Sequence, residues 1–261
     1  MTKKQIFILQ LIFTLLVCSF LIIPVFLSAL AGITENFFIG IKSGFTLRWV
    51  FEVLDLYSET IYLSIIIAIV CLFATLIIGI PAAYVLARIG GRISRIIEET
   101  IVLPVAIPGL AIALALIIIY GGYRDFRSSW YFILVGHILF TLPFMVRSVL
   151  AVLSSTNFKE LEEGAASLGA PFWTRFITIV LPNIKQGILA GSLMVFTLSI
   201  GEFNLTWMLH TPITKTLPVG LADSYASMRL EVASAYTLIF FIMIIPLLLC
   251  MQYLSKDKNK N

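Results

Sequence analysis

Long apolar stretches alternate with short polar segments along the whole chain. Five of these stretches contain no charged residue, and each provides the ~20 residues that a membrane-spanning helix needs. One more stretch, residues 186–209, is interrupted only by Glu202 and is otherwise long enough to cross. The pattern predicts an all-α, polytopic membrane protein with six transmembrane helices. The uncharged stretches are residues 5–34, 60–87, 100–123, 128–146 and 232–255.

The composition agrees with a membrane protein. Hydrophobic residues make up 60% of the chain and charged residues 12%, whereas a soluble domain is about half apolar and a quarter charged. If the N-terminus lies inside, twelve of the 18 Lys and Arg residues fall on the cytoplasmic side, as the positive-inside rule requires. We therefore expect both termini and residues 157–182 to be cytoplasmic. The net charge of +4 suits anionic lipid headgroups, and no basic patch with interleaved aromatic residues indicates nucleic-acid binding.

Residues 157–182 form the one long polar interruption between the apolar stretches. Asn157 followed by Glu160 is close to a capping box, which predicts that a helix begins at Phe158. One stripe of that helix is apolar and another is polar, so we expect an amphipathic helix. The apolar stripe holds Phe158, Leu161, Ala165 and Leu168, and the polar stripe holds Glu160, Glu163 and Ser167.

The same segment contains the signals for a bend. Gly169 suits the left-handed backbone that closes a helix, and Pro171 suits the start of a second one. Pro182 is expected to end this second helix. We therefore predict two short helices around Gly169. On the helical pattern alone, an amphipathic helix that lies at the membrane interface is an alternative interpretation.

The spacing of residues in this segment resembles a known signature, the EAA motif of the integral-membrane permease subunits of binding-protein-dependent ATP-binding-cassette (ABC) importers. The chain departs from the motif at Gly164, where the family has alanine, and glycine costs up to about 1 kcal/mol of helix propensity against alanine. The residues that carry the resemblance are Glu163, Ala165, Gly169, Ile179, Leu181 and Pro182.

The resemblance implies a type I (MetI-like) importer transmembrane domain whose cytoplasmic loop docks on a separate ATPase. It covers residues 60–254, with an N-terminal helix and outer loop in residues 1–59 and a cytoplasmic tail in residues 255–261. The resemblance assigns the following residues to the ATPase-coupling loop: Glu160, Glu163, Gly164, Ala165, Ala166, Gly169, Ile179, Leu181 and Pro182.

The resemblance also implies partners. In this family two permease subunits form the solute pathway, two ATPases bind ATP and Mg²⁺, and an extracytoplasmic binding protein delivers the solute. The branches that the chain resembles carry polyamines, phosphonates, iron or sulfate, which implies a small charged solute such as a polyamine or phosphonate. The resemblance places the chain in the bacterial inner membrane and implies no metal or cofactor for the chain itself.

Several enzyme motifs are missing from the sequence. No GxxxxGK[ST] phosphate loop occurs, so ATP hydrolysis is expected in a partner subunit. No HExxH motif, Cys/His ligand set or Ser/His/Asp constellation occurs, which argues against a protease or a metalloenzyme. We therefore expect a non-catalytic subunit. An ion-coupled secondary transporter and a structural membrane scaffold are the alternatives.

Three polar residues within the apolar stretches are candidates for the solute pathway: Glu202, Asn204 and His137. Ionisable side chains inside a membrane usually face a bundle interior or a water-filled path. However, Glu202 falls near the outer edge of the hydrocarbon core, where a carboxylate also meets water. A lone histidine in a helix bundle is more often a hydrogen-bonded structural residue than a ligand. The sequence leaves both roles open for these residues.

Two further patterns concern the helices themselves. Gly187 and Gly191 have GxxxG spacing, which predicts close helix packing within this chain or with a partner subunit. Pro104 and Pro108 lie four residues apart, which predicts a broken helix in the third apolar stretch.

Overall fold

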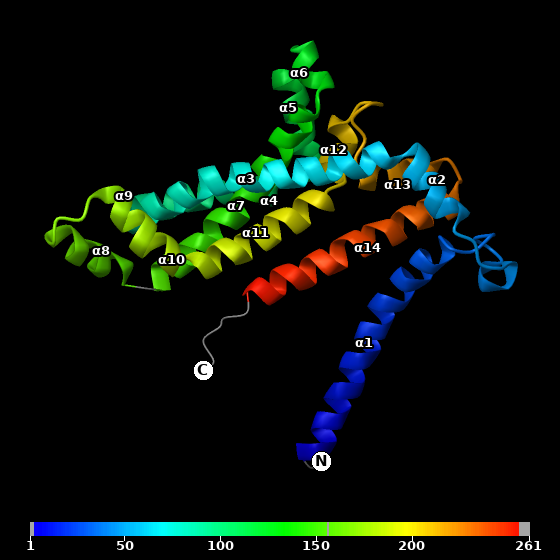
Figure 1. Ribbon diagram of the computed structural model, residues 1–261, viewed down its shortest axis with the longest axis horizontal. Helices are drawn as coiled ribbons and strands as arrows, with labels where there is room; N and C mark the ends of the chain where they lie inside the picture. Colours follow the sequence, from blue (N-terminus) through cyan, green and yellow to red (C-terminus); the bar gives the residue numbers. More distant parts are fainter. Residues whose placement is uncertain (1–2, 156, 256–261) are drawn as a thin grey trace. The chain divides into compact units, whose positions relative to one another are not determined.

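The computed structural model describes residues 3–155 and 157–255, and these residues are almost entirely helical (Figure 1). Within this part of the chain, β-structure is limited to an isolated bridge between Thr34 and Phe45. The all-α prediction is therefore confirmed. The elements are α1 (Lys3–Ala31), η1 (Gly40–Ser43), α2 (Arg48–Leu56), α3 (Ser58–Ile89), α4 (Gly91–Ala106), α5 (Gly109–Tyr120), α6 (Arg124–Ser128), α7 (Trp130–Ser155), α8 (Phe158–Ser167), α9 (Phe172–Arg175), η2 (Phe176–Val180), α10 (Leu181–Asn183), α11 (Lys185–Ile200), α12 (Asn204–Leu209), α13 (Leu217–Ala226) and α14 (Leu230–Ser255).

Four of the described helices are long and apolar enough to cross a membrane unbroken: α1, α3, α7 and α14. Two further crossings result when each of two bent pairs counts as one span. The helices α4 and α5 meet at 99°, and the segment Phe172–Asn183 meets α11 at 68°. The described residues therefore contain four continuous spans, and the number reaches the predicted six only when each bent pair counts as one span.

The breaks lie partly where the sequence predicted them. The third span is broken at the prolines, because α4 ends at Ala106 and α5 begins at Gly109, directly after Pro108. The expectation of one continuous helix over residues 186–209 is wrong. The helix α11 ends at Ile200, and α12 begins only after a three-residue break that contains Glu202.

The chain divides into two compact units, of which the first contains residues 1–58 and 220–243. In this unit the backbone N–H of Phe37 donates to the Glu231 carboxylate at 2.9 Å, and Arg229 donates to the Tyr57 hydroxyl at 2.9 Å and to Glu52. These contacts tie the segment that follows α1 to the start of α14. The segment between α1 and α3 is thus a folded part of the first unit.

The second unit contains residues 59–219 and 244–261, and its core forms where α7 and α11 run side by side (Figure 1). An added Cβ on Gly187 would lie 2.7 Å from the Ser148 carbonyl oxygen, and one on Gly191 would lie 2.8 Å from Met145 Sδ. Met145 and Val149 are fully buried at this contact. The GxxxG pattern is therefore used for packing within this chain.

This contact predicts opposite effects for two glycine-to-alanine changes. We expect Gly187→Ala to destabilise the protein by about 1–3 kcal/mol, because the backbone of α7 must move to admit the methyl group. Gly164→Ala, in α8, meets nothing within 4 Å and should be neutral or stabilising by up to about 1 kcal/mol through helix propensity. The thermal denaturation midpoints of the purified variants measure both effects. Equal midpoints would show that the close approach at Gly187 is relieved without strain.

Candidate functional site

The segment 157–182 forms a helical loop at the end of α7, and the bend that the sequence predicted is present. The helix α8 begins at Phe158, as expected, and ends at Ser167. Gly169 follows with φ of +86°, in the left-handed region that favours glycine. Pro171 then precedes the first residue of α9. The prediction of two short helices around Gly169 is confirmed.

The predicted capping box at the start of α8 is wrong. The Asn157 side chain accepts no hydrogen bond from the first turn of the helix. Instead its Nδ2 donates to Glu160 Oε2 at 3.3 Å, on the exposed surface. In a capping box, Glu160 would instead accept a hydrogen bond from the Asn157 backbone N–H. Here the Asn157 side chain donates to Glu160.

The end of the second helix also differs from the prediction. Pro182 does not end the helical run, because α10 continues to Asn183. The residues Phe176–Val180 form a π-helical turn immediately before it. A proline lacks the backbone N–H and its ring clashes with the preceding turn, and a wider turn relieves that clash. The chain changes direction only at Ile184, where α11 follows.

The buried face of α8 contains only part of the apolar stripe that the periodicity indicated. Phe158 and Glu162 are 4% and 0% exposed, whereas Leu161 and Leu168 are 51% and 90% exposed. A helix buries the face that finds partners in the rest of the chain, and here that face includes a carboxylate. Glu162 is therefore a residue that the sequence analysis missed as part of the site.

The partners of Glu162 come from two other helices. Glu162 Oε1 accepts a hydrogen bond from the Tyr84 hydroxyl at 2.7 Å. Arg88 Nη2 lies 3.4 Å from Glu162 Oε2, and Arg175 Nη1 lies 3.8 Å from Glu162 Oε1. Tyr84 and Arg88 belong to α3, and Arg175 belongs to α9. Because Tyr84 is 78 positions away along the chain, no local sequence pattern indicated this contact.

The other residues of the signature lie on the surface of the loop or at its edge. The Ser167 hydroxyl donates to the Glu163 carbonyl oxygen at 2.9 Å, and the Glu163 carboxylate is left on the exposed side of α8. The exposed residues are Glu160, Glu163, Gly164, Ala166, Gly169 and Pro182, and the half-buried residues are Ala165, Ile179 and Leu181.

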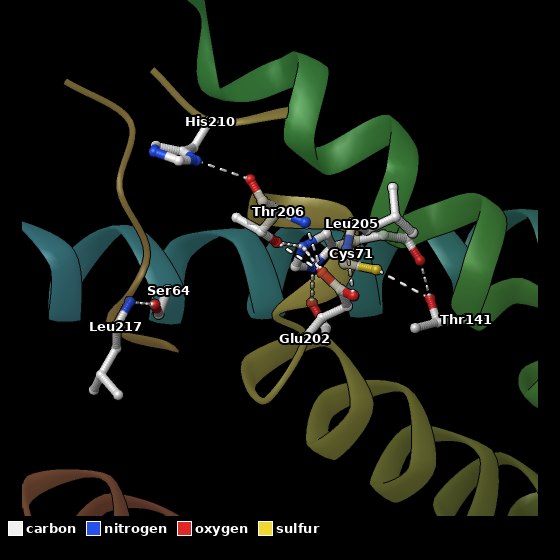
Figure 2. Close-up of polar contacts among 10 residues, drawn as sticks. Ser64, Cys71, Thr141, Glu202, Leu205, Thr206, His210 and Leu217 are labelled. Atoms are coloured by element: carbon white, nitrogen blue, oxygen red, sulfur yellow. Dashed lines mark hydrogen bonds and ion pairs between the residues drawn. The ribbon is translucent and has the colours of Figure 1, made fainter. Parts of the chain in front are cut away.

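A second group of polar residues lies at the opposite end of α11, around the break before α12 (Figure 2). The Glu202 carboxylate accepts hydrogen bonds from the backbone N–H groups of Leu205 and Thr206, both at 2.8 Å. It also accepts one from the Thr206 hydroxyl at 2.8 Å. Glu202 therefore satisfies the free amides at the start of α12, as a capping residue does. This geometry favours a structural role for Glu202.

His137 belongs to the same group and is 1% exposed. Its Nδ1 lies 2.8 Å from Ser199 Oγ, and its Nε2 lies 2.8 Å from Thr206 Oγ1. Because the single hydroxyl hydrogen of Thr206 goes to Glu202, Nε2 must carry a hydrogen and donate to Thr206. Nδ1 then accepts from Ser199, and the hydrogen bonds run in one direction from Ser199 to Glu202. Both ring nitrogens of His137 thus have hydrogen-bond partners inside the bundle.

Asn204 differs from its neighbours because it is exposed on the first turn of α12. The structure therefore brings all three pathway candidates into one region but gives them different surroundings. Among the described residues, no group of three or more His, Cys, Asp or Glu side chains is arranged to hold a metal ion.

Comparison with known proteins shows relatives that are named as transport permeases. Residues 75–260 match the family described as binding-protein-dependent transport system inner membrane component. A sulfate transport system permease protein of Synechocystis is 26% identical over 77% of this chain and 77% of its own length. A molybdenum transport system permease protein of Haemophilus influenzae is 29% identical over 77% of this chain and 95% of its own length. A putrescine transport system permease protein of Escherichia coli is 29% identical over 80% of this chain and 77% of its own length.

The fold is also found in a solved structure. A chain of a bacterial ABC transporter involved in the import of the acidic polysaccharide alginate matches with a TM-score of 0.69 at 18% identity, covering 99% of this chain and 98% of that one. At this identity the likeness shows the fold alone. The match to the family covers most of the sequence. The chain therefore belongs to the binding-protein-dependent transport system inner membrane component family and is a multi-pass inner-membrane permease subunit of an ABC importer.

Proposed function

We propose that the loop 157–182 couples this permease to a separate ATPase. The observation that carries the proposal is the division of α8 into two faces. Glu162 is buried against α3 and α9, while its neighbours Leu161 and Glu163, which project from different sides of the helix, are both exposed. Leu168, directly after the end of α8, is exposed as well. A helix whose exposed surface carries both apolar and charged side chains suits contact with another protein.

In this proposal the chain forms half of a solute pathway, and a second permease subunit forms the other half. Two ATPases bind ATP and Mg²⁺ and dock on the loops from the cytoplasm, where both termini also lie. An extracytoplasmic binding protein delivers the solute. Closure of the ATPases moves the loops and switches the pathway between inward-facing and outward-facing states. The excess of Lys and Arg on the same side as the loop supports this orientation.

The names of the relatives support a small charged solute. They are permeases of sulfate, molybdenum and putrescine transport systems, and a further relative is a putative 2-aminoethylphosphonate permease of Salmonella typhimurium. These solutes include both anions and cations, so the names support a small charged solute, such as a polyamine or a phosphonate, without fixing the sign of its charge. Asn204 is exposed beside the break before α12 and faces the route of the solute in this proposal, while Glu202 and His137 hold α12 in position.

The docking role of the loop is tested by charge reversal at Glu163. We expect Glu163→Lys to reduce co-purification with the ATPase by at least about fivefold, because an exposed carboxylate in an interface is replaced by an unpaired cation. Abundance in the membrane should not change, since the side chain makes no buried contact. Asp125→Lys, on the exposed surface of α6, is the matched control and should leave docking intact. Normal docking of the Glu163→Lys variant would contradict the proposal that the exposed surface of α8 binds the ATPase. Uptake without any ATPase subunit would indicate an ion-coupled transporter.

The bend at Gly169 provides an independent test of the loop. We expect Gly169→Val to abolish most uptake, because a β-branched residue resists positive φ and the strain of about 1–2 kcal/mol disturbs the angle between α8 and α9. No atom lies within 4 Å of the added Cβ position, so the strain is confined to the backbone. Gly169→Asn should retain more uptake, because asparagine enters the left-handed region more readily. Uptake by the Gly169→Val variant at the level of the parent would show that the bend is unimportant.

The cap on α12 predicts how Glu202 acts. We expect Glu202→Gln to lower the thermal denaturation midpoint and the uptake rate together, because an amide group cannot accept all three hydrogen bonds; a lost cap of this kind costs about 0.5–2 kcal/mol. Asn204→Ala should lower uptake with little change in the midpoint. A Glu202 variant that loses uptake at an unchanged midpoint would instead place its carboxylate in the solute pathway.

A further inference from the structure

Four side chains gather around the buried Glu162 carboxylate between the loop and the transmembrane helix α3. We name this group the Glu162 cluster: Tyr84, Arg88, Glu162 and Arg175. Glu162 is 0% exposed, and its carboxylate is approached by the Tyr84 hydroxyl and by both guanidinium groups. The four residues lie on three elements, α3, α8 and α9. The cluster therefore joins both halves of the loop to one transmembrane helix.

Aromatic packing reinforces the same junction. The Tyr84 ring lies 6.2 Å from the ring of Phe158 in α8, measured between centroids. It lies 6.1 Å from the ring of Phe172 in α9 and 5.5 Å from that of Phe176 in η2. Rings at these distances attract one another beyond their simple burial. The Tyr84 side chain thus contacts three aromatic rings of the loop and, through its hydroxyl, the Glu162 carboxylate.

The charges make this junction resistant to partial movement. A carboxylate without a partner in a dry environment is strongly unfavourable, and removing one partner of a buried ion pair is far more damaging than removing an exposed pair. If the loop moved while α3 stayed still, Glu162 would leave Tyr84 and Arg88 behind. The favourable movement is one in which the loop and α3 travel together.

The neighbouring residues Glu162 and Glu163 of α8 therefore have different roles. Successive residues of an α-helix point about 100° apart, since one turn takes 3.6 residues. Glu162 points into the cluster, and Glu163 is exposed. The cluster itself contacts the permease only, whereas the exposed face of α8 is free for another protein.

We infer that the Glu162 cluster is the joint that transmits movement of the coupling loop to α3, with Glu162 and Tyr84 as positioning residues. The inference rests on the proposed function, in which the ATPase moves this loop. It adds a specific route: force applied at the exposed face of α8 enters the membrane through the tyrosine and arginine side chains of α3. Loss of the joint uncouples ATP hydrolysis from transport without preventing docking.

The joint is tested first in the permease alone, reconstituted in lipid nanodiscs without ATPase. Trypsin cleaves after Lys159, an exposed residue of α8, only when that helix opens locally, and the cleavage rate follows the open population. We expect Tyr84→Phe and Glu162→Gln each to raise the cleavage rate by at least about fivefold, in proportion to the rise in the open population. Ser94→Ala is the matched control, because its hydroxyl donates to Leu86 at 2.8 Å near the same end of α3 without contacting the loop.

The double variant separates a joint from two unrelated contacts. If Tyr84 and Glu162 act as one unit, Tyr84→Phe combined with Glu162→Gln should cleave no faster than the more damaged single variant. Additive effects, or a cleavage rate equal to that of the Ser94 variant, would overturn the inference. This result is independent of the proposed function, because no ATPase is present.

The second test uses the complete importer in proteoliposomes, with the ATPase, the partner permease and the binding protein. We expect Tyr84→Phe, the milder change, to keep ATPase co-purification within about twofold of the parent while the solute imported per ATP hydrolysed falls at least about fivefold, the lower end of usual coupling between two sites. A purely structural role would lower uptake and hydrolysis in parallel and leave their ratio unchanged, which would overturn the inference. A failure of the proposed function has a different signature: the Glu163→Lys variant would dock normally on the ATPase.

Discussion

The hydrocarbon core offers no water to backbone amides and carbonyls, so every such group inside the membrane needs a partner within the protein. Continuous helices meet this requirement by themselves, whereas a broken helix needs help at each break. Two breaks in the second unit, the one before α5 and the one before α12, lie close together. An added Cβ on Gly109, at the start of α5, would lie 3.4 Å from Asn204 Cβ and 3.9 Å from Glu202 Oε1. These are ordinary van der Waals distances, so the two breaks pack against each other, and Glu202 satisfies the amides that the break before α12 exposes.

The two buried glutamates show two solutions to the same problem. Glu202 is surrounded by donors from its own segment, two backbone amides and one hydroxyl, so its contacts fix local geometry. Glu162 instead depends on side chains from α3 and α9, so its contacts fix the relation between elements. Cations beside Glu162 also explain why its helix buries a carboxylate and leaves two leucines exposed. The difference in donors thus separates a capping residue from a residue that joins helices.

Local signals explain what the sequence predicted well. Gly169 and Pro171 indicated the bend because their backbone preferences are intrinsic, and Pro108 indicated the break before α5 for the same reason. The GxxxG pattern also predicted a close contact, although its partner, α7, came only from the structure. The four continuous spans followed from apolar length alone.

The remaining features depend on residues far apart in the chain. Helical periodicity separates the faces of α8 but does not tell which face finds partners, so the exposure of Leu161 and Leu168 was not foreseen. Asn157 and Pro182 were misjudged because a neighbouring side chain and a π-helical turn changed their surroundings. The candidate site could therefore be located from sequence, while its buried charge could not.

The order of synthesis gives the His137 hydrogen bonds a further meaning. Ser199 and Thr206, which bind the imidazole, lie 62 and 69 positions after it. When α7 enters the bilayer during translation, Ser199 and Thr206 have not yet been synthesised. The His137 ring therefore lacks the two hydrogen-bond partners that it has in the folded protein. Buried polar groups without partners are unfavourable in hydrocarbon, and the arrival of α11 and α12 removes that disadvantage. The bundle of the second unit therefore reaches its stable packing only when its late segments are inserted, and a chain that stops before Thr206 carries an incompletely satisfied histidine within the membrane.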